Sequence, residues 1–222
     1  AEGYTFESCR RCHLQKRKEM KDIYWASLPT HIPGSDLENT KPDDNNKIEK
    51  VHNKIYFYSE VSRSKNLELN LAIKSLESDL LHGAQLAGGD PRKIFLHINS
   101  YGGSVFAGFS SVDYIRGCKV PTVSVIDGCA ASAATIMSVT ADHRQINKHA
   151  YMLIHQLSSG MWGKYQEQKD TMENNNRLME MIISIYEEHT KIPKKELDKL
   201  LKHDLWWDAE TCLKYGLVDE II

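Results

Sequence analysis

The sequence predicts an α/β protein with a largely parallel sheet, built from repeated strand-then-helix units. Apolar, β-rich runs near residues 54–58, 94–99 and 122–126 each stop at turn residues, and each is followed by a stretch with helical character. Successive units of this kind imply right-handed crossovers and helices packed outside the sheet. Ligands are then expected at the carboxyl ends of the strands.

Length and composition narrow the class of protein. At 222 residues the chain is long enough for one sizeable core with an appended arm. Its 28 basic and 30 acidic residues give a net charge of −2, so charge offers no reason to expect nucleic acid as the main partner. No apolar run is long enough to span a bilayer, and the first residues lack the apolar centre of a secretory signal. We therefore expect a soluble, cytoplasmic protein that binds neither nucleic acid nor membrane.

The first 50 residues differ in composition from the rest of the chain. They mix basic and acidic side chains and then run through prolines, a glycine and a cluster of aspartates and asparagines. We interpret residues 1–50 as an N-terminal arm and linker, and residues 51–222 as the globular domain. An apolar cluster at residues 23–28 is expected to pack against a neighbouring surface.

The cysteines do not indicate a disulfide framework, because there are five of them in a chain of this size. Cys9 and Cys12 form a C-x-x-C pair followed by His13, which together with His31 could supply zinc ligands. A second such pair is missing, so structural or incidental cysteines are favoured and zinc is the alternative. We expect no metal, with Cys9 and Cys12 as the zinc candidates. The same residues match the haem-attachment pattern C-x-x-C-H, but we interpret this match as chance because no export signal accompanies it.

The first two units are read directly from hydrophobic periodicity. Strand 54–58 leads into a helix that ends at a glycine-rich turn over 87–91. Strand 94–99 leads through the turn 100–104 into an amphipathic helix that reaches residue 115. The apolar positions expected on the first helix are Leu67, Leu69, Leu71, Ile73, Leu76, Leu80 and Leu81.

The third unit contains the stretch on which the functional argument depends. Strand 122–126 should stop at a turn formed by Asp127 and Gly128, and the small residues that follow favour a helix beginning at Ser132. A helix start offers unpaired N–H groups and a partial positive charge, so an oxyanion formed near Ser132 would meet donors. Ser132 is therefore a candidate nucleophile. The alternative is a helix cap or a small residue at a packed joint.

A second glycine-rich turn is expected beside Ser132, at the end of the neighbouring strand. Gly102 and Gly103 would supply backbone N–H groups without side-chain obstruction. A phosphate-binding loop is the alternative. It is disfavoured because the chain has neither a Walker lysine nor the third glycine of a dinucleotide fingerprint at this position.

A histidine and an aspartate complete the candidate site. His155 ends an apolar strand over 151–155, and an imidazole at a strand end can reach a hydroxyl on a neighbouring turn. His155 is therefore a candidate general base for Ser132, with a structural histidine as the alternative. Asp204 could orient His155 through its other ring nitrogen. The alternative for Asp204 is a cap or an exposed loop carboxylate.

Three helices are expected in the C-terminal third. A long segment over 166–189 has apolar positions separated by charges, and part of its surface is expected to meet another subunit because one small domain cannot cover it. A short helix follows over 193–201. Asp208 is the expected cap of a last helix that ends at Gly216.

Four short motifs of this chain occur in a fixed order. They are Asn99-Ser100-Tyr101-Gly102-Gly103-Ser104-Val105, Gly128-Cys129-Ala130-Ala131-Ser132, Met152-Leu153-Ile154-His155-Gln156 and Tyr215-Gly216-Leu217-Val218-Asp219. In this order and spacing they closely resemble the ClpP family, the proteolytic subunits of ATP-dependent Clp serine proteases. The resemblance runs from about Lys54 to the C-terminus, and four motifs in register are far more specific than any one of them.

The resemblance implies a role for each candidate residue. Ser132 matches the family nucleophile, His155 the general base and Asp204 the acid that orients the base. Gly103 and Ala133 match the backbone donors of the oxyanion hole. The implied activity is that of an ATP-dependent Clp-type serine endopeptidase subunit, which hydrolyses unfolded proteins inside a ring chamber through a Ser-His-Asp triad.

The resemblance also implies the fold, the assembly and the partners. Residues 156–163 resemble the peptide-binding strand of the family, and residues 166–189 its protruding handle helix. The implied fold is crotonase-like α/β, in two stacked heptameric rings. Unfolded polypeptide is supplied by a Clp-type AAA+ unfoldase that uses ATP, whereas this chain needs no cofactor; the segment that docks the unfoldase is not recognisable here. The substrate-binding candidates are Gly102, Gln156, Leu157, Ser158 and Ser159.

Other classes of protein compete with this interpretation. A non-catalytic or assembly subunit of a Clp-like ring is one alternative. An acyl-CoA hydratase or isomerase on the crotonase fold is another, which would use glutamates and no Ser-His-Asp set. A Ser-Lys dyad with Lys148 or Lys164 is conceivable, but His155 and Asp204 make it unnecessary.

Overall fold

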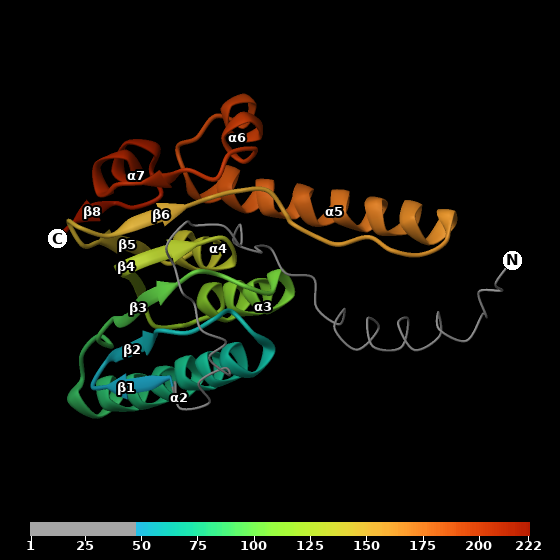
Figure 1. The fold of residues 1–222 in the computed structure, drawn as a ribbon. Helices are drawn as coiled ribbons and strands as arrows, with labels where there is room; N and C mark the ends of the chain where they lie inside the picture. The colour runs from blue at the N-terminus through green and yellow to red at the C-terminus, as the bar shows by residue number, and fades with distance from the viewer. Residues whose placement is uncertain (1–47) are drawn as a thin grey trace, which may run out of the picture.

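The computed structural model describes residues 48–222, in which a mixed β-sheet is packed against helices (Figure 1). Within these residues the sheet has eight strands. Six of them follow the order β1-β2-β3-β4-β5-β8, while β6 pairs with β4 and β7 pairs with β6. Only the β1–β2 and β6–β7 pairs of the described sheet are antiparallel. The strands are β1 (Glu49–Val51), β2 (Lys54–Phe57), β3 (Ile94–Ser100), β4 (Thr122–Ala131), β5 (His143–Ile146), β6 (Tyr151–Leu153), β7 (Trp206–Trp207) and β8 (Glu220–Ile221).

The three predicted strand-then-helix units are confirmed. They are β2–α2, β3–α3 and β4–α4, and their strands are parallel neighbours in the sheet. Helix α3 packs against both α2 and α4 (Figure 1). The helices are α2 (Arg63–Ala87), α3 (Val105–Arg116), α4 (Ala133–Val139), α5 (Tyr165–His189), α6 (Lys194–Leu200) and α7 (Ala209–Tyr215).

The core lies between the sheet and the helices of these units. Along β3 every second side chain is buried, which is the period expected of a strand with one covered face. All seven residues of α4 are buried, and its first two are the alanines 133 and 134. Small side chains at the start of α4 let the sheet approach the helix closely. Ser132 immediately precedes this fully buried helix.

The predicted end of the third strand is wrong. Strand β4 continues through Asp127 and Gly128 to Ala131, because its second half gains a new partner. Residues 123–126 pair with β5, whereas residues 129–131 pair with β6, and the register against β3 shifts at the same place. Aspartate and glycine here mark an irregularity within a strand and not a turn that ends one.

Several short strands were not predicted. The strands β1, β5, β7 and β8 have two to four residues each, too few to show an alternation of apolar and polar side chains. The predicted strand 151–155 is shorter than expected, because β6 ends at Leu153 and His155 follows in irregular backbone.

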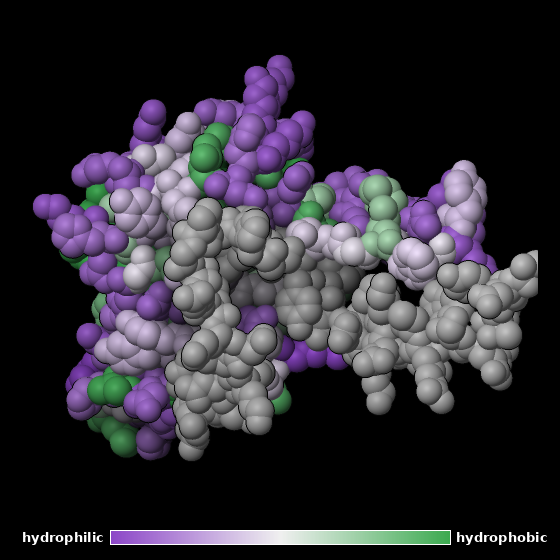
Figure 2. Space-filling model, in the orientation of Figure 1, coloured by the Kyte–Doolittle hydropathy of each residue, from purple (hydrophilic) through white to green (hydrophobic). Residues whose placement is uncertain are grey.

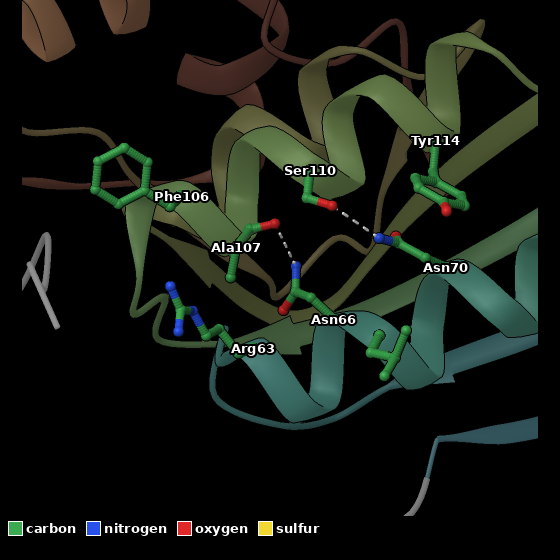
Figure 3. A pocket seen from close by; sticks show the side chains of 8 residues that line it. Arg63, Asn66, Asn70, Phe106, Ala107, Ser110 and Tyr114 are labelled. Atoms are coloured by element: carbon green, nitrogen blue, oxygen red, sulfur yellow. Dashed lines mark hydrogen bonds between the residues drawn. The ribbon is translucent and has the colours of Figure 1, made fainter. Parts of the chain in front are cut away.

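Two of the apolar positions expected at helical spacing on α2 are exposed. Leu67 and Leu71 have 58% and 59% of their surface accessible, whereas Leu69 and Ile73 of the same helix are buried. Leu67 borders a groove of about 340 Å³ between α2 and α3, where Phe106 is also exposed (Figure 3). Across the groove floor, Asn66 Nδ2 donates to the Ala107 carbonyl at 2.9 Å.

The long C-terminal helix projects from the rest of the fold, as predicted (Figure 1). Helix α5 begins at Tyr165, one residue before the expected start, and its buried residues Ile182, Ile185 and Tyr186 all lie in the half that meets the body. The projecting half carries hydrophobic side chains among hydrophilic ones (Figure 2). Met172 is an example, with 48% of its surface exposed.

The last two helices are confirmed together with their caps. Pro193 is the N-cap of α6, and the Asp208 carboxylate accepts from Thr211 N at 2.9 Å at the start of α7. Gly216 ends α7 in the left-handed conformation. Across residues 48–222, none of the helices combines the length and hydrophobicity that a membrane span requires.

Candidate active site

Ser132 is the single residue between β4 and α4, and it has an unusual backbone conformation. Its φ is 60° and its ψ is −127°, which is costly for a residue with a side chain. Hydrogen bonds hold this conformation. Ser132 N donates to the Leu153 carbonyl at 2.9 Å, and the Ser132 carbonyl accepts from Thr135 N at 2.9 Å. Strained strand-to-helix turns of this kind are found at nucleophiles.

Ser132 occupies the N-cap position of α4, but its side chain makes no capping hydrogen bond. The side chain is fully buried, and its Oγ has no hydrogen-bond partner among the described residues. A buried hydroxyl without a partner weakens the fold. Such a group is typical of a site at which a ligand or reacting atom completes the hydrogen bonding.

The two-glycine turn lies against Ser132, as predicted. Gly102 has a φ of 94°, and a Cβ on it would lie 2.6 Å from Ser132 Cβ and 3.1 Å from Ala133 N. Gly103 has a φ of 146°, and a Cβ there would overlap the Val61 carbonyl. The turn is fixed by Val61 N, which donates to the Gly102 carbonyl at 2.8 Å. Both glycines are therefore required by close backbone approach.

His155 and Asp204 form a hydrogen-bonded pair. His155 Nδ1 lies 2.9 Å from Asp204 Oδ1, although the two residues are 49 positions apart. The imidazole is largely buried, whereas 65% of the Asp204 side chain is exposed. Burial lowers the pKa of His155 below 6.5, and the charge and hydrogen bond of Asp204 offset only part of that effect. The lowered pKa favours the neutral imidazole, which is the form that can accept a proton.

The sheet brings Ser132 and His155 to neighbouring strand ends. Strand β6 pairs in parallel with the end of β4, with Ala131 opposite Leu153. Ser132 follows the first of these residues directly, and His155 follows the second by two positions. The hydrogen bond from Ser132 N to the Leu153 carbonyl ties the two ends together. One edge of the sheet thus presents Ser132, His155 and the glycine turn.

The candidate substrate-binding residues follow His155 in extended backbone. Gln156 N donates to the Leu201 carbonyl at 2.7 Å. Leu157 N lies 3.0 Å from Met179 Sδ on α5, and Asn175 Nδ2 donates to Ser159 Oγ at 2.6 Å. Gln156 and Ser159 are exposed, while Leu157 and Ser158 are half-buried. The segment is held along α5 and retains an open side.

Two residues that the sequence analysis missed lie behind Ser132. Thr135 Oγ1 donates to the Ser132 carbonyl at 2.6 Å, and Tyr186 OH lies 2.5 Å from Thr135 Oγ1. Tyr186 belongs to α5 and is fully buried. The signal in the sequence is a tyrosine on a helix face that otherwise carries isoleucines, because a buried phenol needs a hydrogen-bond partner.

A second missed cluster surrounds Asp127, at the irregularity in β4. His97 Nδ1 lies 2.9 Å from Asp127 Oδ2, Tyr58 OH donates to the same oxygen at 2.6 Å, and Asn147 Nδ2 donates to Oδ1 at 2.9 Å. Burial alone would raise the pKa of Asp127, but the hydrogen bonds from His97 and Tyr58 hold it below its usual value. A half-buried carboxylate with these partners explains why aspartate is tolerated within a strand.

A metal centre finds no support in the part of the chain that the structure describes. Between residues 48 and 222, no three His, Cys, Asp or Glu side chains are grouped so as to hold a metal ion. The zinc candidates Cys9 and Cys12 lie outside the described residues. The cysteines at 118, 129 and 212 are free thiols.

Comparisons with known proteins agree on one family. A family model described as Clp protease matches residues 46–222. The chain is 29% identical over 133 residues to the ATP-dependent Clp protease proteolytic subunit of Deinococcus radiodurans, an alignment that covers 59% of this chain and 65% of that protein. It is 32% identical over 152 residues to the protein of that name from Porphyromonas gingivalis, with 66% of each chain covered. The chain thus spans about two thirds of the length of these curated relatives.

A solved structure shows the same fold. A mutant of ClpP1 from Listeria monocytogenes superposes with a TM-score of 0.65 and covers 77% of this chain and 91% of its own. Its sequence is 24% identical, so the likeness concerns the fold alone. The expected ClpP-like, crotonase-type α/β architecture with a protruding handle helix is therefore confirmed.

Proposed function

The chain belongs to the Clp protease family, and we propose that it is a serine endopeptidase subunit that hydrolyses peptide bonds of unfolded polypeptides. One observation carries the proposal. The strained Ser132 turn, with its buried and unpartnered hydroxyl, follows the end of β4, and the His155–Asp204 pair follows the end of β6, which is paired with it. A nucleophile beside a base, with the base oriented by a carboxylate, is the arrangement that acyl transfer requires.

In the proposed reaction Ser132 Oγ attacks the peptide carbonyl carbon while His155 Nε2 accepts its proton. The Asp204 carboxylate accepts a hydrogen bond from His155 Nδ1–H and stabilises the imidazolium that forms. His155 then donates the proton to the leaving amine, which releases the first product and leaves an acyl group on Ser132. A water molecule, deprotonated by His155, attacks the acyl carbon. The bond between that carbon and Ser132 Oγ then breaks, Oγ takes the proton back from His155, and the second product is released.

The oxyanion formed in both steps is assigned to two backbone donors. The N–H groups of Gly103 and Ala133 are proposed to donate to it, because the glycine turn lies against the start of α4. The start of a buried helix also contributes a partial positive charge. The peptide itself is proposed to pair with the open side of residues 156–159, next to Gly102.

Assembly and partners are part of the same proposal. Residues 51–222 would form the peptidase domain, with residues 1–50 as an arm. The exposed hydrophobic side chains on the projecting half of α5 favour contact with another copy of the chain, in stacked heptameric rings. Unfolded substrate would be supplied by a Clp-type unfoldase that consumes ATP, and no cofactor is assigned to this chain.

The pH dependence of hydrolysis should follow the ionisation of His155. We expect kcat/KM to rise with pH to a plateau, with a midpoint below 6.5. Only neutral imidazole can accept the Ser132 proton, so below the midpoint the rate falls about tenfold per pH unit. The measurement is kcat/KM on a fluorogenic peptide from about pH 5 to pH 8.5. Thermal unfolding at each pH serves as the control, and a midpoint clearly above 6.5 would contradict the assignment.

The function is tested by assaying the purified full-length chain, fractionated on a sizing column, for hydrolysis of a fluorogenic peptide. The proposal predicts hydrolysis that coincides with a large assembly and is lost when His155 is replaced by alanine. A well-formed ring without hydrolysis, and without gain of activity in the presence of a Clp-type unfoldase and ATP, would contradict it. That result would favour a non-catalytic ring subunit.

A further inference from the structure

A buried chain of hydrogen bonds connects the handle helix to the candidate nucleophile. Thr135 Oγ1 lies 2.6 Å from the Ser132 carbonyl oxygen and donates to it. The threonine hydroxyl has one proton, so the contact of 2.5 Å between Thr135 Oγ1 and Tyr186 OH must use the tyrosine proton. The order of donation is therefore Tyr186 to Thr135 to Ser132.

Each member of this chain is shielded from water. Tyr186, Thr135 and Ser132 all have 0% of their surface exposed. Burial raises the pKa of Tyr186, which keeps the phenol protonated and able to donate. Water cannot replace a hydrogen bond that is lost in such surroundings. Removal of either hydroxyl would therefore weaken the hydrogen bonding of the Ser132 carbonyl.

These hydrogen bonds act on a residue whose backbone is strained. Ser132 keeps a φ of 60° only because its neighbours oppose relaxation. Its carbonyl accepts from both Thr135 N and Thr135 Oγ1, which fixes the peptide plane between Ser132 and Ala133. That plane also contains the N–H of Ala133, which the proposed function assigns to the oxyanion hole. A rotation of this plane would misplace that donor.

Helix α5 holds the substrate segment as well as the nucleophile turn. Leu157 N lies 3.0 Å from Met179 Sδ, and Met179 precedes Tyr186 by seven residues, which is two helical turns. Both side chains therefore point from one side of α5 towards the body. The helix thus connects the segment next to His155 with the back of Ser132.

We propose that Tyr186 is a positioning residue for the nucleophile, which acts through Thr135 on the Ser132 carbonyl and the Ala133 N–H. This inference rests on the proposed peptidase function. It assigns to α5 a role in the chemical step in addition to its role as a projecting handle. The hydrogen bonds from Tyr186 and Thr135 act on the peptide plane of the nucleophile and do not contact substrate. Their loss should therefore lower kcat and leave KM nearly unchanged.

The test compares Tyr186→Phe with the wild-type protein in two assays, the rate of labelling by a fluorophosphonate probe and the kcat and KM for a fluorogenic peptide. We expect a reduction of about tenfold in labelling rate and kcat, which is the effect of one buried hydrogen bond. Thr135→Val should give a similar loss, and the double variant no more than either single variant. Thr135→Ser, which keeps the hydroxyl, should retain most of the wild-type rate.

The matched control is Tyr215→Phe, which removes a phenol on α7 that donates to Glu196 Oε1 at 2.9 Å and not to Thr135 or Ser132. It should label at the wild-type rate. Unfolding midpoints of all variants show whether each is folded at the assay temperature. Equal rates for wild type and Tyr186→Phe, or additive losses in the double variant, would overturn the inference while leaving the peptidase assignment intact. A wild-type chain that is not labelled would overturn both.

Discussion

Replacement of Ser132 by alanine is expected to lower peptide hydrolysis by a factor on the order of 10⁴ or more. The Oγ atom is the only proposed nucleophile, and a methyl group cannot form the acyl intermediate. We expect the free energy of unfolding to stay the same or to rise, because the deleted hydroxyl is buried and has no hydrogen-bond partner in the described structure. Hydrolysis of a fluorogenic peptide and urea unfolding are the two measurements.

Ser138→Ala is the matched control for this variant. Ser138 lies on α4, the helix that follows Ser132, and is also buried, but its hydroxyl donates to the Thr135 carbonyl at 3.0 Å. We expect it to keep near-wild-type activity and to lose about 1 kcal/mol of stability. If Ser132→Ala hydrolysed peptide at the wild-type rate, another residue would have to be the nucleophile. If both variants lost activity equally, the loss would reflect the helix and not the hydroxyl.

Replacement of Gly102 by alanine is expected to abolish activity and to destabilise the fold. The added Cβ would lie 2.6 Å from both the Ala131 carbonyl oxygen and Ser132 Cβ, and the φ of 94° is itself unfavourable for alanine. Overpacking and backbone strain together should cost about 2–5 kcal/mol of unfolding free energy. Hydrolysis should fall at least about 100-fold, because a small displacement of the nucleophile is sufficient for such a loss.

Gly83→Ala provides the contrast, because a Cβ there would meet none of the described atoms within 4 Å and Gly83 lies within helix α2. That variant should keep its activity and gain about 0.5–1 kcal/mol of stability, since alanine favours a helix more than glycine does. An active and stable Gly102→Ala protein would show that the glycine turn does not approach Ser132 as closely as the structure has it.

The sequence was informative where local patterns decide the structure. The strand-then-helix units, the handle helix and the caps at Asp208 and Gly216 follow from periodicity and turn residues, and each is present. The nearness of Gly102 to Ser132 could also be expected, because adjacent parallel strands bring their ends together. The pairing of His155 with Asp204 was only one of two uses expected for Asp204 until the family motifs favoured it, since nothing local connects residues 49 positions apart.

The misses have a common physical cause. Asp127 and Gly128 read locally as a turn, but the strand continues because β6, which lies beyond them in the sequence, pairs with its second half. Leu67 and Leu71 fit a helical period, which does not reveal the side of the helix that the sheet covers. The bond between Thr135 and Tyr186 joins hydroxyls 51 residues apart. All of these features depend on tertiary partners.

The most direct test of Ser132 as the nucleophile is to locate the adduct of a fluorophosphonate probe by mass spectrometry after proteolysis of the labelled protein. We expect a single adduct on Ser132, absent from the Ser132→Ala protein and formed much more slowly when His155 is replaced by alanine. An adduct on another serine, or an assembled wild-type protein that forms none, would contradict the assignment of Ser132 as the nucleophile.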